Sequence, residues 1–182
     1  AEPGFAGRIP GWQAAALAAR RERGALIARR HWLGRTRRCH GDLHLGNIVL
    51  LGGRPVPFDA IEFNEAIASI DVLYDIAFAL ADLVTRGRAD LANGLLSRYL
   101  GATRDYGGLA VLPLCLSMRG AVRAMTAASR GASGAAEVAF AFAETALVAP
   151  PAPRLVAIGG LSGTGKSTVA RGLAPDLAPL LG

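Results

Sequence analysis

The residues best suited to chemistry in this sequence lie between positions 40 and 59. His40 stands two positions before Asp42, Asn47 follows Asp42 by five, and Asp59 comes after an apolar run. Phosphoryl transfer uses one carboxylate to orient the acceptor hydroxyl and take its proton. It uses an amide and a second carboxylate to hold Mg²⁺ against the nucleotide phosphates. The spacing therefore predicts Asp42, the base, and His40 as catalytic residues, with Asn47 and Asp59 as ligands of Mg²⁺.

A second group of residues, suited to binding phosphate, lies later in the sequence. Residues 160–167 read Gly-Leu-Ser-Gly-Thr-Gly-Lys-Ser, the P-loop pattern, and the apolar stretch at 154–158 predicts the strand that should precede it. In such a loop backbone N–H groups surround the phosphates, the lysine reaches the β- and γ-phosphates, and the serine hydroxyl ligates Mg²⁺. The predicted nucleotide-binding residues are Gly160, Ser162, Gly163, Thr164, Gly165, Lys166, Ser167 and Thr168, with Ser167 also a metal ligand.

The elements around the first group predict how its ligands meet. Residues 47–51 and 54–58 are predicted strands, and Gly52-Gly53 fits a two-residue hairpin turn. Such a hairpin would carry Asn47 and Asp59 at adjoining ends. A further short strand is predicted within 31–38. Apolar periodicity predicts helices at 11–30, broken at Gly24, and at 72–84, 89–102, 109–130 and 135–148, before a proline-rich linker at 149–153.

Several charged residues around these helices leave two interpretations open. Asp71 is a plausible N-cap of the helix that follows it, and Asp75 lies one turn further on. Arg119 and Arg123 are also one turn apart and could bind an anion or a carboxylate, although a surface position is favoured. Glu62 could contact the metal through water or simply face solvent.

The run at 40–47, His-Gly-Asp-Leu-His-Leu-Gly-Asn, resembles the HGDLHxGN motif of the aminoglycoside phosphotransferase family, which has a protein-kinase-like fold. The runs at 58–64 and 70–77 are similar to those of a subfamily in which such a domain precedes a P-loop ATP-binding domain. The resemblance extends from about residue 24 to 174. It implies ATP-dependent, Mg²⁺-dependent transfer of the γ-phosphate to a small-molecule hydroxyl. It also implies that Asp71 or Asp75 braces the catalytic loop by accepting backbone N–H bonds, with capping alone as the alternative.

The implied fold is α+β. Residues 1–148 would form the mostly helical C-terminal lobe of a kinase-like fold with its catalytic-loop hairpin, and residues 154–182 the opening strand, P-loop and helix of an α/β domain. Lys166 is the only lysine, no glycine-rich hairpin precedes His40, and no further strands follow the P-loop. We therefore expect an internal segment of a larger bifunctional protein, weakly active or inactive alone.

Some of these residues also fit functional classes other than phosphoryl transfer. A kinase-like lobe without activity, serving as a binding or regulatory module beside the P-loop domain, is the main alternative. Cys39, His40 and His44 could suggest zinc, but a structural site requires four ligands in spaced pairs. The net charge of +6 reflects arginines between positions 20 and 38. No aromatic platform accompanies them, so a solvated face is favoured over nucleic-acid binding.

Composition limits the remaining choices. Hydrophobic residues make up 52% of the chain, which excludes wholesale disorder. Two cysteines without a disulfide framework fit a reducing compartment. No signal sequence and no membrane-length apolar run is present, so we expect a cytoplasmic protein without a membrane partner.

Overall fold

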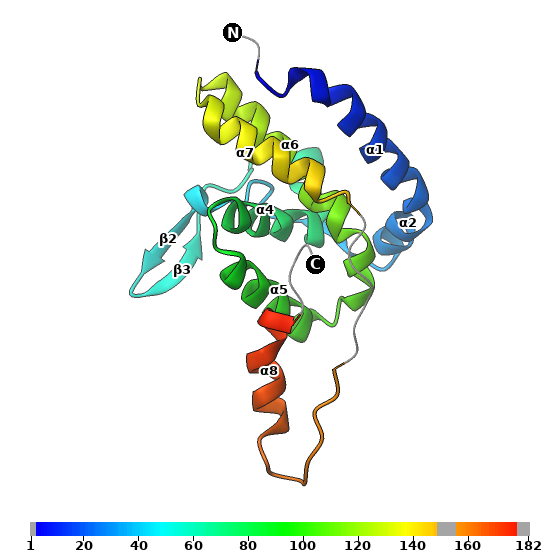
Figure 1. Ribbon diagram of the computed structural model, residues 1–182, viewed down its shortest axis with the longest axis vertical. Coiled ribbons are helices and arrows are strands. Elements are labelled where there is room, and N and C mark those ends of the chain that lie inside the picture. The colour runs from blue at the N-terminus through cyan, green and yellow to red at the C-terminus, as the bar shows by residue number, and fades with distance from the viewer. Residues whose placement is uncertain (1–2, 149–155, 178–182) are drawn as a thin grey trace.

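The structure is a computed structural model that describes residues 3–148 and 156–177. It is a mostly helical α+β fold with two small antiparallel sheets (Figure 1). The helices are η1 Ala6–Arg8, α1 Ile9–Glu22, α2 Gly24–Trp32, η2 Leu45–Asn47, α3 Glu65–Ala68, α4 Val72–Thr85, α5 Ala89–Thr103, η3 Tyr106–Ala110, α6 Leu112–Ser129, α7 Ser133–Thr145 and α8 Lys166–Leu177. The strands are β1 Thr36–Arg38, β2 Ile48–Leu51, β3 Arg54–Pro57 and β4 Ser69–Asp71.

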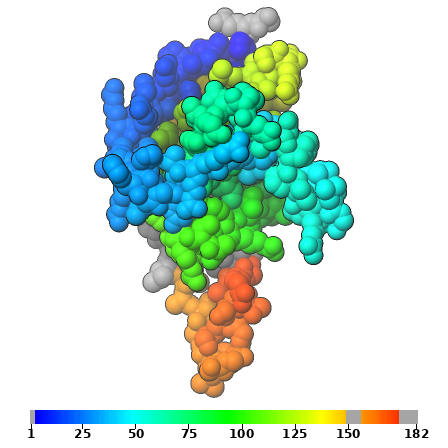
Figure 2. Space-filling model, turned by 180° about the vertical axis from the view of Figure 1, so that it is seen from behind, coloured from blue at the N-terminus to red at the C-terminus, as the bar shows by residue number. Residues whose placement is uncertain are grey.

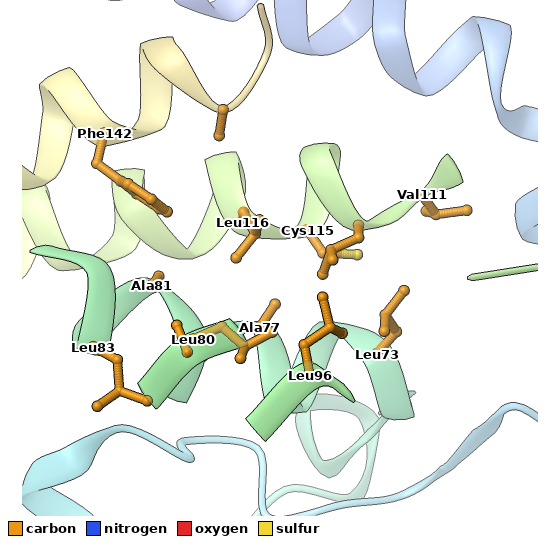
Figure 3. Packing of buried hydrophobic residues seen from close by; sticks show 13 residues of the cluster. Leu73, Ala77, Leu80, Ala81, Leu83, Leu96, Val111, Cys115, Leu116 and Phe142 are labelled. Atoms are coloured by element: carbon orange, nitrogen blue, oxygen red, sulfur yellow. The ribbon is translucent and has the colours of Figure 1, made fainter. Parts of the chain in front are cut away.

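The main core lies where α4 packs against α6, with α5 and α7 on either side. Figure 3 shows α4 side chains, among them Leu73 and Leu80, pointing toward Leu116 of α6. All three are fully buried, and each such side chain contributes about 1.5–3 kcal/mol through the apolar surface it removes from water. The apolar spacing of 72–84 therefore predicted the correct face of α4.

Helices α6 and α7 approach closely because a glycine stands between them. A β-carbon added at Gly120 would lie 2.9 Å from a ring atom of Phe142 and 3.1 Å from the carbonyl oxygen of Ala139. One turn earlier in α6, the Trp12 indole of α1 donates a hydrogen bond of 2.8 Å to Ser117, whose hydroxyl donates to the carbonyl of Ala143 in α7 at 2.7 Å. These contacts tie α1, α6 and α7 into one body.

The β2–β3 hairpin forms as predicted and projects from the helices (Figure 1). Ile48 pairs with Pro57 and Leu51 with Arg54. The two linking glycines, Gly52 and Gly53, have φ angles of 56° and 76°, which a residue with a β-carbon rarely adopts. The second sheet pairs β1 with β4, which places the segment before the catalytic loop beside the start of α4.

Most helix predictions are confirmed, with shifts at their ends. The break at Gly24 is real, since α1 ends at Glu22 and α2 begins at Gly24. Helix α2 continues to Trp32, so the predicted strand occupies only Thr36–Arg38. The long helix begins at 112 instead of 109, because η3 precedes it and Pro113 lies in its first turn, where a missing N–H costs nothing.

The predicted strand at 154–158 is wrong where the structure describes it. Val156–Ile158 has no strand conformation, and residues 154 and 155 lie outside the described residues, as does the predicted linker at 149–153. A strand needs a neighbour to satisfy its N–H and C=O groups. All the strand pairing within residues 3–148 and 156–177 is between β1 and β4 or β2 and β3. Helix α8 packs against α5 and extends away from the rest of the molecule (Figure 2).

A buried ion network corrects the expectation that the arginines of the first helices face solvent. Arg30 is only 3% exposed. Its guanidinium donates to both carboxylate oxygens of Asp71, at 2.6 and 2.8 Å, and to both of Asp105, at 2.7 and 2.8 Å. Tyr99 also donates to Asp105, at 3.0 Å. Asp71 at the same time caps α4 by accepting the N–H of Leu73 at 2.8 Å.

Candidate active site

The loop at 40–47 holds its two central side chains against each other. The amide nitrogen of Asn47 donates to the backbone carbonyl of Asp42 at 3.0 Å and lies 3.2 Å from the Asp42 carboxylate. Asn47 is 8% exposed, and its own N–H donates to the carbonyl of His44 at 2.9 Å within η2. The carboxylate of Asp42 is therefore fixed in direction while part of it remains open to solvent.

The hairpin brings Asp59 to this loop. Phe58 donates its N–H to the carbonyl of Asn47 at 2.9 Å, so Asp59 is the first residue beyond that pair. Its φ angle is 60°, a left-handed conformation that is uncommon without glycine. His40 Nε2 donates to the carbonyl of Phe58 at 2.8 Å, and the carbonyl of His40 accepts the N–H of Ile61 at 2.9 Å. These bonds fasten the segment around Asp59 to the start of the loop.

The donor set at this point fits Mg²⁺. The amide nitrogen of Asn47 is committed to Asp42, which leaves its amide oxygen for a cation, and the exposed Asp59 supplies a carboxylate. Mg²⁺ prefers oxygen ligands and is commonly held by one or two protein groups together with substrate phosphates and water. When bound, Mg²⁺ with ATP would supply the phosphoryl group and neutralise its developing charge.

Asp75 lies beneath the loop and accepts two of its backbone N–H groups. The N–H of His40 is 3.1 Å from one carboxylate oxygen and that of Gly41 is 2.9 Å from the other. Asp75 is 8% exposed. Gly41 has φ 84°, and a β-carbon there would lie 2.9 Å from Ile61, so this turn requires glycine. Of the two acids named from the sequence, Asp75 thus contacts the loop, whereas Asp71 caps α4 and binds Arg30.

Arg119 supports the same turn from α6, which contradicts the surface position favoured from the sequence. It is 5% exposed and donates to the carbonyls of Gly41 and Tyr74, each at 3.0 Å. Its guanidinium lies 3.9 Å from the centre of the Tyr74 ring and 4.6 Å from that of Phe78, within the range of cation–π attraction. It is also 3.9 Å from Asp75.

Asp82 is a loop contact that the sequence did not reveal. It is 1% exposed, and its carboxylate accepts the N–H of Leu45 at 3.0 Å and pairs with Arg123 at 3.0 Å. Asp75 and Asp82 are seven residues apart, two turns along one face of α4. The available signal was a pair of acids recurring at helical spacing in an otherwise apolar helix.

His44 faces Asp42 from within the loop. Its Nδ1 accepts the N–H of Gly46 at 2.9 Å, so Nε2 carries the proton, and this atom lies 3.5 Å from the Asp42 carboxylate. Burial lowers the pKa of His44, and Asp42 opposes this by raising it. No three His, Cys, Asp or Glu side chains gather into a metal site within residues 3–148 and 156–177.

The P-loop residues lie together at the start of α8, away from the loop at 40–47. Gly160, Gly163 and Gly165 have positive φ angles of 150°, 82° and 80°. Lys166 Nζ donates to the carbonyl of Leu161 at 2.5 Å, so its side chain folds back over its own loop. The rest of the predicted set, Ser162, Thr164, Ser167 and Thr168, is exposed. Since α8 contacts α5 while α4 and α6 hold the catalytic loop, the structure does not bring the two predicted sites together.

Comparison with known families agrees with the geometry of the first site. Residues 4–112 match the sequence model of the phosphotransferase enzyme family. The matched residues are more than half of the chain, so the chain belongs to this family, and the predicted resemblance to phosphotransferases is confirmed at that level. The P-loop fusion and the individual site roles stay predictions.

The curated relatives are mycobacterial proteins described as uncharacterized. One from Mycobacterium tuberculosis and one from Mycobacterium bovis are each 33% identical to this chain over 140 residues. The alignment covers 74% of this chain but 28% of each relative, so the chain spans a little over a quarter of their length. No solved structure matches the chain. No helix in the part of the chain that the structure describes is long and apolar enough to span a membrane.

Proposed function

We propose that the complete protein transfers the γ-phosphate of ATP to a hydroxyl of a small molecule at the loop containing Asp42. The observation that carries this proposal is the hydrogen-bonded pair of Asp42 and Asn47, with Asp59 beside Asn47 across the hairpin. A base and two metal ligands of these types are what the catalytic loop of a kinase-like site contributes. Family membership supports the same reaction class.

Each residue has a defined task in this proposal. Asp42 orients the acceptor hydroxyl and takes its proton as the new oxygen–phosphorus bond forms and the bond to the β-phosphate oxygen breaks. Asn47 and Asp59 hold Mg²⁺. His40 joins the loop to the Asp59 segment through Phe58, and Asp75 fixes the turn. The hydrogen bonds that hold Asp42 come from the loop itself, which favours electrostatic preorganisation.

We further propose that residues 160–168 begin a second, P-loop nucleotide site in the complete protein. Its support is the motif itself, the positive φ angles of Gly160, Gly163 and Gly165, and the start of α8 at Lys166. Backbone N–H groups and the helix dipole at this end would attract phosphate. We place the protein in the cytoplasm, where the free thiols Cys39 and Cys115 would remain reduced.

A metal titration tests the proposal against an inactive kinase-like module. In a Lys166→Ala background, which removes the P-loop contribution, Asp59→Ala should weaken Mg²⁺-dependent ATP binding by about tenfold or more, because a charged ligand is lost. Asp90→Ala, which removes an exposed carboxylate on α5, is the matched control and should change nothing. Equal affinity in the Asp59 and Asp90 variants would favour the inactive module.

A further inference from the structure

A surface pocket of about 460 Å³ lies between the ends of α4 and α6 and the first turn of α7. This volume is in the range of small-molecule sites. Its charged lining residues are Asp82, Arg86, Arg123 and Arg130, and the rest are mainly small residues and threonines. We call it the arginine pocket. The pocket lining therefore contains three guanidinium groups and one carboxylate.

The only carboxylate among the lining residues of the arginine pocket, that of Asp82, is already paired with protein groups. Asp82 pairs with Arg123 at 3.0 Å and with Arg86 at 3.5 Å, and it also accepts the N–H of Leu45. Arg130 has no carboxylate partner within residues 3–148 and 156–177. The pocket thus holds an excess of positive charge that the described protein groups do not neutralise. The start of α7, whose N-cap Ala132 makes no side-chain cap, adds unoccupied backbone N–H groups.

The arginine pocket lies next to the catalytic loop. Asp82 forms its wall and binds the backbone of Leu45 directly. Asp82 thus links the wall of the arginine pocket to the loop that carries Asp42.

We propose that the arginine pocket binds an anionic group, phosphate or carboxylate, on the acceptor whose hydroxyl Asp42 orients. This proposal rests on the proposed function and names the substrate class for it. Guanidinium groups bind both anions through paired, charge-assisted hydrogen bonds. Polycationic acceptors would be repelled by the same charges, so an anionic acceptor is expected and an aminoglycoside is not.

Anion binding is tested first, without catalysis. Calorimetric titration of the complete protein carrying Lys166→Ala, with inorganic phosphate and separately with acetate, would show which anion the arginine pocket binds. Arg130→Gln should weaken that binding by about tenfold, because one charge-assisted contact is lost. Arg29→Gln, an equal charge change at an exposed site on α2, should leave it unchanged. No binding, or equal loss in both variants, would overturn the proposal.

Transfer is tested next with acceptors that share a sugar ring and carry either an anionic or a neutral group at C6. Glucose 6-phosphate and glucuronate are compared with glucose as acceptors of γ-phosphate from ATP. We expect the anionic compounds to be preferred, and Arg130→Gln to raise their KM by about tenfold at nearly constant kcat. If glucose is the preferred acceptor and Arg130→Gln does not change the transfer rate, the proposed role of the arginine pocket is wrong. The proposed function would then still hold. If phosphate binding depends on Arg130 but the protein transfers no phosphate, the arginine pocket is still an anion site. The proposed phosphotransferase function would then be wrong.

Discussion

Arg119 offers the sharpest test of how the catalytic loop is held. Its side chain is buried in α6 and donates to the carbonyls of Gly41 and Tyr74, each at 3.0 Å. Replacing it with methionine keeps much of the volume but removes both donors and the charge near Asp75. Replacing it with lysine keeps the charge, yet one ammonium group cannot reproduce the planar fork that reaches both carbonyls.

The contacts of Arg119 determine how much unfolding free energy its replacement should cost. Each buried acceptor left without a donor costs about 1–3 kcal/mol. In Arg119→Met the Gly41 carbonyl loses its arginine donor, and the Tyr74 carbonyl loses a donor additional to its own helical hydrogen bond. A buried carboxylate also loses its neighbouring cation at 3.9 Å. We therefore expect the free energy of unfolding to fall by about 3–5 kcal/mol, in line with breaking buried ion pairs in general. Arg119→Lys should lose about half of that.

Urea denaturation of the wild-type chain and each variant measures this loss directly. Arg98→Met, which removes an exposed arginine from α5, is the matched control and should stay within about 0.5 kcal/mol of wild type. Hydrogen exchange at the amides of His40 and Gly41 should accelerate in Arg119→Met, because the turn they belong to loses its support. An Arg119→Met chain as stable as the Arg98→Met chain would refute the role of Arg119 as a buried brace.

Two further predictions concern packing and pH. Gly120→Ala should destabilise the chain by about 1–3 kcal/mol, because its methyl group would press on α7. Gly94→Ala, which has open space around it in the middle of α5, should instead stabilise the chain by about 0.5–1 kcal/mol. Equal urea unfolding midpoints for the two variants would contradict both predictions. Burial raises the pKa of Asp105, but hydrogen bonds from Arg30 and Tyr99 outweigh it and hold that pKa below its usual value. Since the pKa is lower in the folded chain, this stabilisation is complete above about pH 4 and is lost on further acidification. The urea midpoint of Asp105→Asn should therefore fall less steeply with decreasing pH than that of wild type. An unchanged slope would contradict a stabilising ion network of Arg30 and Asp105.

The local features of the site follow from the sequence alone. The spacing of Asp42 and Asn47, and the hairpin that returns to Asp59, depend on neighbouring residues and on two glycines that tolerate positive φ. The apolar face of α4 follows from periodicity within one helix. These features are local, so short-range rules were enough to predict them.

The residues that support the site from a distance could not be predicted in the same way. Arg119 contacts Gly41 across 78 positions, and Arg30 contacts Asp105 across 75. A lone arginine on a helix resembles a surface residue until the partner that buries it is known. Tertiary packing alone decides which arginines are buried, and Arg29, next to Arg30, remains exposed.

Phosphoryl transfer at Asp42 is tested most directly by measuring γ-phosphate transfer in the complete protein carrying Asp42→Asn, with radiolabelled ATP and a mixture of neutral and anionic hydroxyl compounds. We predict that transfer falls by about 10²–10⁴-fold, the usual contribution of a general base, while ATP binds as in wild type. Lys166→Ala should leave this transfer largely intact, since the proposed P-loop site is separate from the loop at 40–47. Full turnover in Asp42→Asn would contradict phosphoryl transfer at this loop.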